Sequence, residues 1–107
     1  MHIFQQAKQG NINECARIFH RTPGAILLDV RTESEYRSGH IPGSKNIPLQ
    51  QLDKVESVAE NKEGALFVYC YSGARSGQAV SQLRRMGYTN VQNIGGIAAY
   101  HGKVDIL

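Results

Sequence analysis

The sequence predicts one α/β domain over residues 1–107, with a mostly parallel five-stranded sheet covered by helices on both faces. Short apolar runs bounded by glycine or proline alternate along the chain with segments of helical periodicity. The apolar runs are continuous, which is typical of strands buried on both faces of a parallel sheet. Ligands bind beyond the carboxyl ends of such strands, so the residues that follow each strand are the first candidates for function.

Five segments have the composition of strands. The clearest are residues 25–30, which follow a Pro-Gly pair, and residues 65–69, which follow Gly64. Three shorter segments complete the predicted sheet: residues 3–4, residues 44–47 and residues 90–94. Cys70 therefore lies at the carboxyl end of a buried strand.

Helices are predicted between the strands from periodicity and capping. Residues 12, 15, 16 and 19 fall on one helical face, which predicts a helix before the first long strand. Thr32 and Glu35 have the spacing of a capping box, in which each side chain accepts a hydrogen bond from the other residue's backbone amide. The helix that they open should end at Gly39.

The second half of the chain contains three further helical patterns. Asp53 and Glu56 have the spacing of another capping box and predict a helix that runs to about residue 61. Residues 76–86 place apolar side chains on one face and predict a helix that Gly87 ends. A short helix near residues 97–100 should close the domain.

Composition and charge narrow the classes of partner. The net charge is +3 and the isoelectric point is near 9.0, which weakly favours anionic small molecules. Arg84-Arg85 is the longest basic run and aromatic residues make up 7% of the chain, so nucleic-acid binding is not expected. No apolar stretch approaches the roughly 20 residues of a membrane span. The sequence does not predict an oligomeric state.

The two cysteines, Cys15 and Cys70, are too few for a disulfide framework, and no Cys/His cluster suggests a metal site. Cys15 lies on the apolar face of its helix and is interpreted as a small buried hydrophobe. Free thiols are typical of a reducing cytosol, so we expect a cytoplasmic protein. The first residues do not have the pattern of a signal peptide, although a signal removed earlier would leave no trace.

The loop that follows the strand at residues 65–69 has the features of a thiolate site. Helix N-termini and nearby arginines lower the pKa of a thiol, and successive loop amides can bind an anion. Gly73 permits the positive φ that such a loop needs, Arg75 supplies a positive charge, and the hydroxyls of Ser72 and Ser76 can donate hydrogen bonds. The pattern alone leaves an ordinary strand-to-helix turn equally open. The candidate site comprises Cys70, Tyr71, Ser72, Gly73, Ala74, Arg75 and Ser76.

Three motifs together resemble the rhodanese family. The first is the segment of residues 28–48, with its Asp-Val-Arg, Glu-Tyr, Gly-His-Ile-Pro-Gly and Asn-Ile-Pro groups. The second is Cys-x-x-Gly-x-Arg-Ser at residues 70–76, and the third is Gly-Gly-Ile at residues 95–97. They occur in the family's order and cover nearly the whole chain. Tyr100 stands where many relatives carry tryptophan, which is a packing position in the resemblance.

The resemblance implies a rhodanese-like three-layer sandwich and sulfurtransferase chemistry. The Cys70 thiolate would take a sulfane sulfur from thiosulfate or another sulfur donor and hold it as a persulfide. Cyanide, a thiol or a protein acceptor would then remove that sulfur. No metal or organic cofactor is implied.

Two charged residues at the end of the first long strand are assigned supporting roles. Asp29 is interpreted as a hydrogen-bonding group near the loop, and Arg31 as paired with Glu35 or with a neighbouring turn. His40 is expected to hold a turn through hydrogen bonds rather than act as a base. Of the two arginines near the loop, Arg75 is the better candidate to bind the donor's anion.

The sequence is also compatible with other functions. Related folds also host phosphatases and arsenate reductases, so the fold does not decide the chemistry. Cysteine phosphatases place five residues between the cysteine and the arginine, whereas four separate Cys70 from Arg75. The shorter loop favours a single sulfur over phosphate. A persulfide carrier and a non-enzymatic binding module are the remaining alternatives, and the presence of Cys70 argues against the second.

Overall fold

The computed structural model describes residues 11–107. Its described part forms a parallel sheet of four strands in the order β2-β1-β3-β4. The strands are β1 (Ile26–Asp29), β2 (Lys45–Asn46), β3 (Leu66–Cys70) and β4 (Val91–Gly96). The helices are α2 (Ile12–His20), α3 (Glu33–Ser38) and α4 (Ala74–Arg85), with 3-10 helices η1 (Leu49–Ser57) and η2 (Ile97–Ala99). The α/β class with a parallel sheet is confirmed.

The sheet has four described strands where five were predicted. The four longer predictions each correspond to a strand, with ends that differ by one or two residues. The fifth prediction, residues 3–4, lies outside the described residues. β3 lies between β1 and β4, so the strand that ends at Cys70 has a neighbour on both sides.

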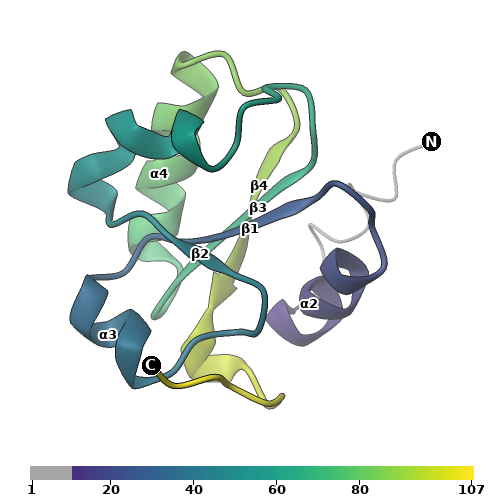
Figure 1. Ribbon diagram of the computed structural model, residues 1–107, viewed down its shortest axis with the longest axis vertical. Coiled ribbons are helices and arrows are strands. Elements are labelled where there is room, and N and C mark those ends of the chain that lie inside the picture. The colour runs from purple at the N-terminus through teal and green to yellow at the C-terminus, as the bar shows by residue number, and fades with distance from the viewer. Residues whose placement is uncertain (1–10) are drawn as a thin grey trace.

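Helices cover both faces of the sheet, and each face has its own core (Figure 1). Leu28, Val68 and Cys70 point to the face covered by α4 and η1, where Val55 and Leu83 pack. The alternate strand residues form a second core under α2, on the opposite face: Leu27, Phe67 and Tyr69. This alternation follows from the two-residue period of a strand, and it places Cys70 on the α4 side.

The first predicted capping box is confirmed and the second is wrong. Thr32 caps α3, its side chain accepts from the Glu35 amide, and Glu35 bonds back to the Thr32 amide. The segment after Pro48 instead forms the 3-10 helix η1, with Asp53 in its interior and no side-chain cap. Leu52 and Val55 are the buried residues of η1, and their spacing of three matches the three-residue turn of a 3-10 helix.

The remaining predictions differ from the structure at their ends. α4 begins at Ala74, two residues before the predicted start, and its N-cap is Gly73. The terminal helix is the 3-10 turn η2. No helix within residues 11–107 is long and apolar enough to span a membrane.

Candidate active site

Cys70 is the last residue of β3, and only 1% of its surface is exposed. Three residues separate it from α4, so the sulfur lies beneath the first turn of that helix. Tyr71, Ser72 and Ala74 form the exposed rim of the loop, and Tyr71 is 54% exposed. The structure therefore brings all seven residues of the candidate loop together around one buried sulfur.

The Cys70 sulfur accepts several hydrogen bonds. The Gly73 amide donates to Sγ at 3.0 Å, and the Ser76 hydroxyl approaches Sγ at 3.3 Å. Burial raises the pKa of the Cys70 thiol, but hydrogen bonds from Ser76, Gly73 and Ser72 outweigh it, and the pKa is lowered overall. The geometry stabilises a thiolate mainly through oriented donors.

The backbone of the loop is arranged as the sequence suggested. Gly73 has φ of 105°, in the region that favours glycine, and it turns its own amide toward the sulfur. Ser76 lies inside the first turn of α4, fully buried, with its hydroxyl directed toward Cys70.

Asn93 of β4 holds this loop, and no motif of the sequence predicted this role. Its amide nitrogen donates to the Gly73 carbonyl at 3.0 Å. Its side-chain oxygen lies 2.7 Å from the Ser76 hydroxyl, whose single proton is shared between this oxygen and the Cys70 sulfur. The Gly95 amide donates to the same oxygen at 2.9 Å. Asn93 occurs near the carboxyl end of a predicted strand, at the same sheet edge as Cys70. That position in the sequence could have indicated its contact with the loop.

The loop also lies directly against the end of β4. A Cβ atom at Gly96 would overlap the carbonyl oxygen of Tyr71, so only glycine allows this approach. The same carbonyl accepts a hydrogen bond from the Ala98 amide at 3.0 Å. The Gly-Gly segment therefore supports the rim of the loop from below.

Two partners were expected for Arg31, Glu35 and a neighbouring turn. Arg31 does not pair with Glu35. Asp29 and Arg31 are two residues apart, and Arg31 donates to both carboxylate oxygens of Asp29, at 3.0 and 2.7 Å. The guanidinium also donates to the Gly39 carbonyl at 2.7 Å, so the expected contact with a neighbouring turn is present. Asp29 is buried, and its carboxylate accepts hydrogen bonds from the amide and the guanidinium of Arg31.

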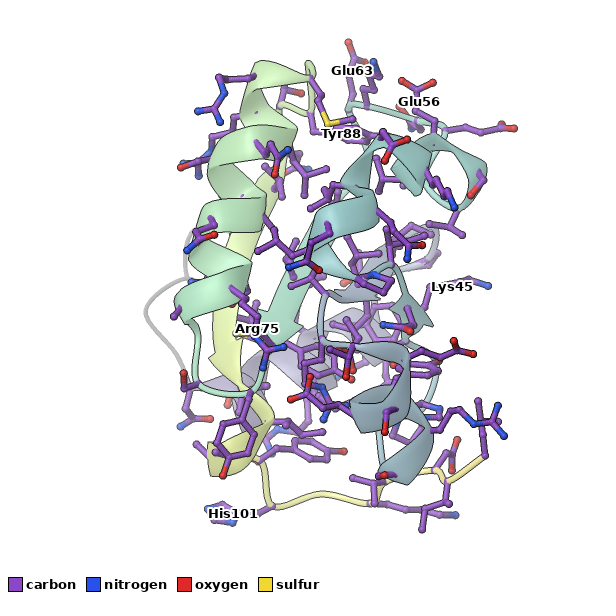
Figure 2. The ribbon with its side chains drawn as sticks, turned by 90° about the vertical axis from the view of Figure 1, so that its left-hand side faces the viewer. Lys45, Glu56, Glu63, Arg75, Tyr88 and His101 are labelled. Atoms are coloured by element: carbon purple, nitrogen blue, oxygen red, sulfur yellow. The ribbon has the colours of Figure 1, made fainter. Side chains whose placement is uncertain are left out.

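Glu35 is instead the partner of Arg75. The two terminal guanidinium nitrogens of Arg75 donate to the two carboxylate oxygens of Glu35, at 2.8 and 3.0 Å. Figure 2 shows Arg75 at the end of α4 nearest the loop, with its side chain turned toward the neighbouring elements. The Arg75 charge interacts with Cys70, and the Arg75 side chain is about one-third exposed.

His40 has the structural role that the sequence suggested. Its Nδ1 lies 2.8 Å from the Tyr36 carbonyl, and its ring stacks on the Tyr36 ring at 3.8 Å. The residue is 5% exposed. These contacts fix the turn that follows α3.

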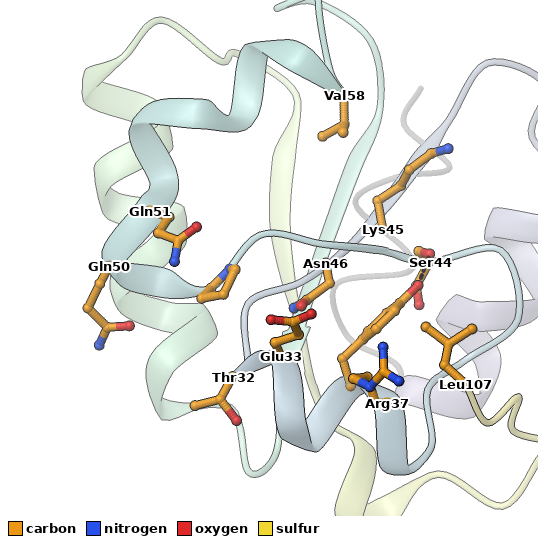
Figure 3. Close-up of a pocket in the computed structure, with 12 residues that line it drawn as sticks. Thr32, Glu33, Arg37, Ser44, Lys45, Asn46, Gln50, Gln51, Val58 and Leu107 are labelled. Carbon is orange, nitrogen blue, oxygen red and sulfur yellow. Dashed lines mark hydrogen bonds between the residues drawn. The ribbon is translucent and has the colours of Figure 1, made fainter.

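A separate hollow lies beside β2. It encloses about 750 Å³ between α3, η1 and the end of the chain, and its wall carries both charged and polar side chains, among them Glu33, Arg37 and Lys45 (Figure 3). None of the loop residues 70–76 lines it. The hollow and the buried sulfur are therefore two distinct features of the surface.

We predict that Ser76→Ala slows alkylation of Cys70 by iodoacetamide about tenfold at a pH below the thiol pKa, because a hydrogen bond to a charged group contributes roughly 1.5 kcal/mol. Removing the hydroxyl raises the pKa of Cys70, so less thiolate is present at a given pH. Ser81→Ala, an exposed position on the same helix, is the matched control. Equal rates in the two variants would contradict the role of Ser76. Cys15 does not interfere, because burial raises its pKa to about 11.

Comparison with known proteins gives consistent matches. A family model described as "Rhodanese-like domain" matches residues 11–103. "Thiosulfate sulfurtransferase PspE" of Escherichia coli is 39% identical over 71 residues, which cover 65% of this chain and 68% of that protein. "Putative sulfur carrier protein YrkF" of Bacillus subtilis is 36% identical, over 74% of this chain and 43% of that protein. The solved structure "rhodanese with anions from E. coli" has a TM-score of 0.73 at 33% identity, and the match covers 78% of this chain and 99% of that one.

Proposed function

The chain belongs to the family of rhodanese-like domains, and from this premise we propose that it transfers a sulfane sulfur through a persulfide on Cys70. The observation that carries the proposal is the buried sulfur of Cys70, which accepts hydrogen bonds from Gly73 and Ser76 at the end of β3. Thiosulfate is the proposed donor, and cyanide or a thiol the proposed acceptor. The similarity to a thiosulfate sulfurtransferase supports the donor.

The proposed reaction has two displacements. The Cys70 thiolate attacks the outer sulfur of thiosulfate, the S–S bond breaks, and its electron pair leaves with sulfite. The persulfide that remains on Cys70 carries a negative charge on its outer sulfur. The acceptor then attacks that sulfur, and the electron pair of the second S–S bond returns to Cys70 as the thiolate.

The loop supplies the groups that such a cycle needs. The amides of Ser72, Gly73 and Ser76 already stabilise negative charge on the Cys70 sulfur, and the outer sulfur of a persulfide would meet the same donors. Tyr71 and Ser72 lie exposed on the rim, where an acceptor would approach. We assign Asp29 and Arg31 a supporting role, because their ion pair lies buried at the end of the neighbouring strand.

Mass spectrometry of the wild-type protein after incubation with thiosulfate tests the proposal. We expect the intact mass to rise by one sulfur atom and to return to its starting value when cyanide is added. The same preparation should hydrolyse p-nitrophenyl phosphate negligibly. Efficient phosphate hydrolysis without any gain of sulfur would favour a phosphatase and overturn the proposal.

The second candidate function is that of a persulfide carrier, which the similarity to a putative sulfur carrier protein favours. A carrier would gain sulfur in the same mass measurement but release it slowly to small thiols and quickly to a protein acceptor. A binding module would gain none. The two cysteines form no disulfide, and we propose that the protein acts in the reducing cytoplasm.

A further inference from the structure

Four charged side chains lie close to the candidate loop, and they form two ion pairs. Arg31 pairs with Asp29, and Arg75 pairs with Glu35. Electrostatic interactions also join the pairs to each other, since Arg31 interacts with Glu35 and Arg75 interacts with Asp29. The two arginines and the two carboxylates cancel, so this group brings no net charge to the loop.

Glu35 is held in place from two sides. Its Oε1 accepts from the Thr32 amide at 2.9 Å and from Arg75 at 2.8 Å, and its Oε2 accepts from Arg75 at 3.0 Å. The bonds to Arg75, followed by those to Thr32, lower the pKa of Glu35 to about 2, despite partial burial. Glu35 therefore stays ionised, and paired with Arg75, at any pH near neutrality.

The pairing changes what Arg75 offers to a substrate. Arg75 carries the positive charge of the candidate loop, and this charge interacts electrostatically with Cys70. Both of its terminal nitrogens donate to Glu35, so an anion that approaches Cys70 meets the guanidinium together with its carboxylate. The ion pair weakens the attraction of Arg75 for an anion at Cys70, and the weakening costs a doubly charged donor more than a singly charged one.

We propose that Glu35 determines the charge selectivity of the site by holding Arg75 in an ion pair, and that it disfavours dianionic sulfur donors relative to monoanionic ones. The proposal rests on the proposed sulfur transfer for its substrate class. Glu35 acts through Arg75 and is a positioning residue. The stabilisation of the Cys70 thiolate by loop amides does not depend on it.

The variant that tests this is Glu35→Gln. Glutamine is accepted at the third position of a capping box, so the start of α3 is retained while the charge is removed. Glu33→Gln is the matched control, because Glu33 lies exposed in the same first turn of α3. This substitution removes the same charge but leaves the partner of Arg75 in place. The double variant Glu35→Gln/Arg75→Ala tests whether the effect requires Arg75.

The first measurement compares thiosulfate with methanethiosulfonate, which presents a similar sulfane linkage with one charge fewer. The quantity compared is the ratio of the KM for thiosulfate to the KM for methanethiosulfonate. In Glu35→Gln we expect this ratio to fall about fivefold, which corresponds to the energy of one partly exposed ion pair. Glu33→Gln should leave the ratio unchanged, and the double variant should have the ratio of the wild-type protein. An unchanged or higher ratio in Glu35→Gln would overturn the proposal.

The second measurement does not depend on sulfur transfer. The alkylation rates of Cys70 with iodoacetate and with iodoacetamide differ in sensitivity to local charge, because only iodoacetate is anionic. We expect the ratio of the iodoacetate rate to the iodoacetamide rate to rise about fivefold in Glu35→Gln. In the double variant, this ratio should return to the wild-type value. A rise without any transfer of sulfur would support the role of Glu35 and refute the proposed function. Transfer with an unchanged alkylation ratio would refute the role of Glu35 alone.

Discussion

Replacing Cys70 with serine is expected to abolish persulfide formation and to reduce sulfur transfer by at least about a thousandfold, the scale of losing a covalent nucleophile. A serine hydroxyl is almost fully protonated at neutral pH, and the loop donors would stabilise no anion on it. The substitution is nearly isosteric, so the fold should be retained. Intact-mass measurement with thiosulfate and a cyanide-coupled assay for thiocyanate both report the effect.

Cys15→Ser is the matched control for this experiment. Cys15 is a fully buried residue of α2, on the face of the sheet opposite to Cys70, and burial raises its pKa to about 11. Sulfur loading and turnover should persist in this variant, with a loss of stability from burying a hydroxyl. If Cys70→Ser still gained sulfur and Cys15→Ser did not, the assignment of the nucleophile would be wrong.

The largest effect on stability is expected for Asp29→Ala, which should lower the free energy of unfolding by about 3–5 kcal/mol. Asp29 is fully buried, and its loss leaves Arg31, a residue that is 5% exposed, without the carboxylate that pairs with its guanidinium. A buried charge without a partner costs far more than the pair itself contributes. Urea unfolding, followed by circular dichroism, measures the difference.

Glu14→Ala provides the comparison on the surface. It breaks the ion pair between Arg17 and Glu14, whose side chains are 60% and 51% exposed, respectively. The free energy of unfolding should fall by less than about 1 kcal/mol. If Asp29→Ala prevents folding, the double variant Asp29→Leu/Arg31→Met should recover folded protein, since it removes both charges. Equal unfolding free energies for Asp29→Ala and Glu14→Ala would show that burial of the pair has no energetic consequence.

The elements that the sequence predicted well are those determined by local patterns. Continuous apolar runs predicted β1 and β3, because a strand buried on both faces needs apolar side chains at nearly every position. Thr32 and Glu35 predicted the start of α3, because a capping box involves only neighbouring backbone groups. The loop at Cys70 was also predicted, since its strand, glycine and helix are contiguous in the chain.

The predictions that failed concern partners chosen in three dimensions. Asp53 and Glu56 have the spacing of a capping box, but Pro48 starts a 3-10 helix earlier and leaves Asp53 in its interior. Arg31 was expected to pair with Glu35, but the folded chain brings Arg75, 40 residues away in the sequence, to that carboxylate. Asn93 reaches the loop across the sheet edge, a contact that spans 20 residues of sequence.

The separation of the two cysteines by the sheet has a consequence for the lifetime of a loaded molecule. Cys15 belongs to the core under α2 and Cys70 to the core under α4, and the chain contains no third cysteine. A sulfur bound to Cys70 would thus be out of reach of Cys15, which could not resolve it as a disulfide. Each persulfidated molecule would keep its outer sulfur until an external nucleophile removes it. The persulfidated fraction would therefore depend on the concentrations of the sulfur donor and the acceptor.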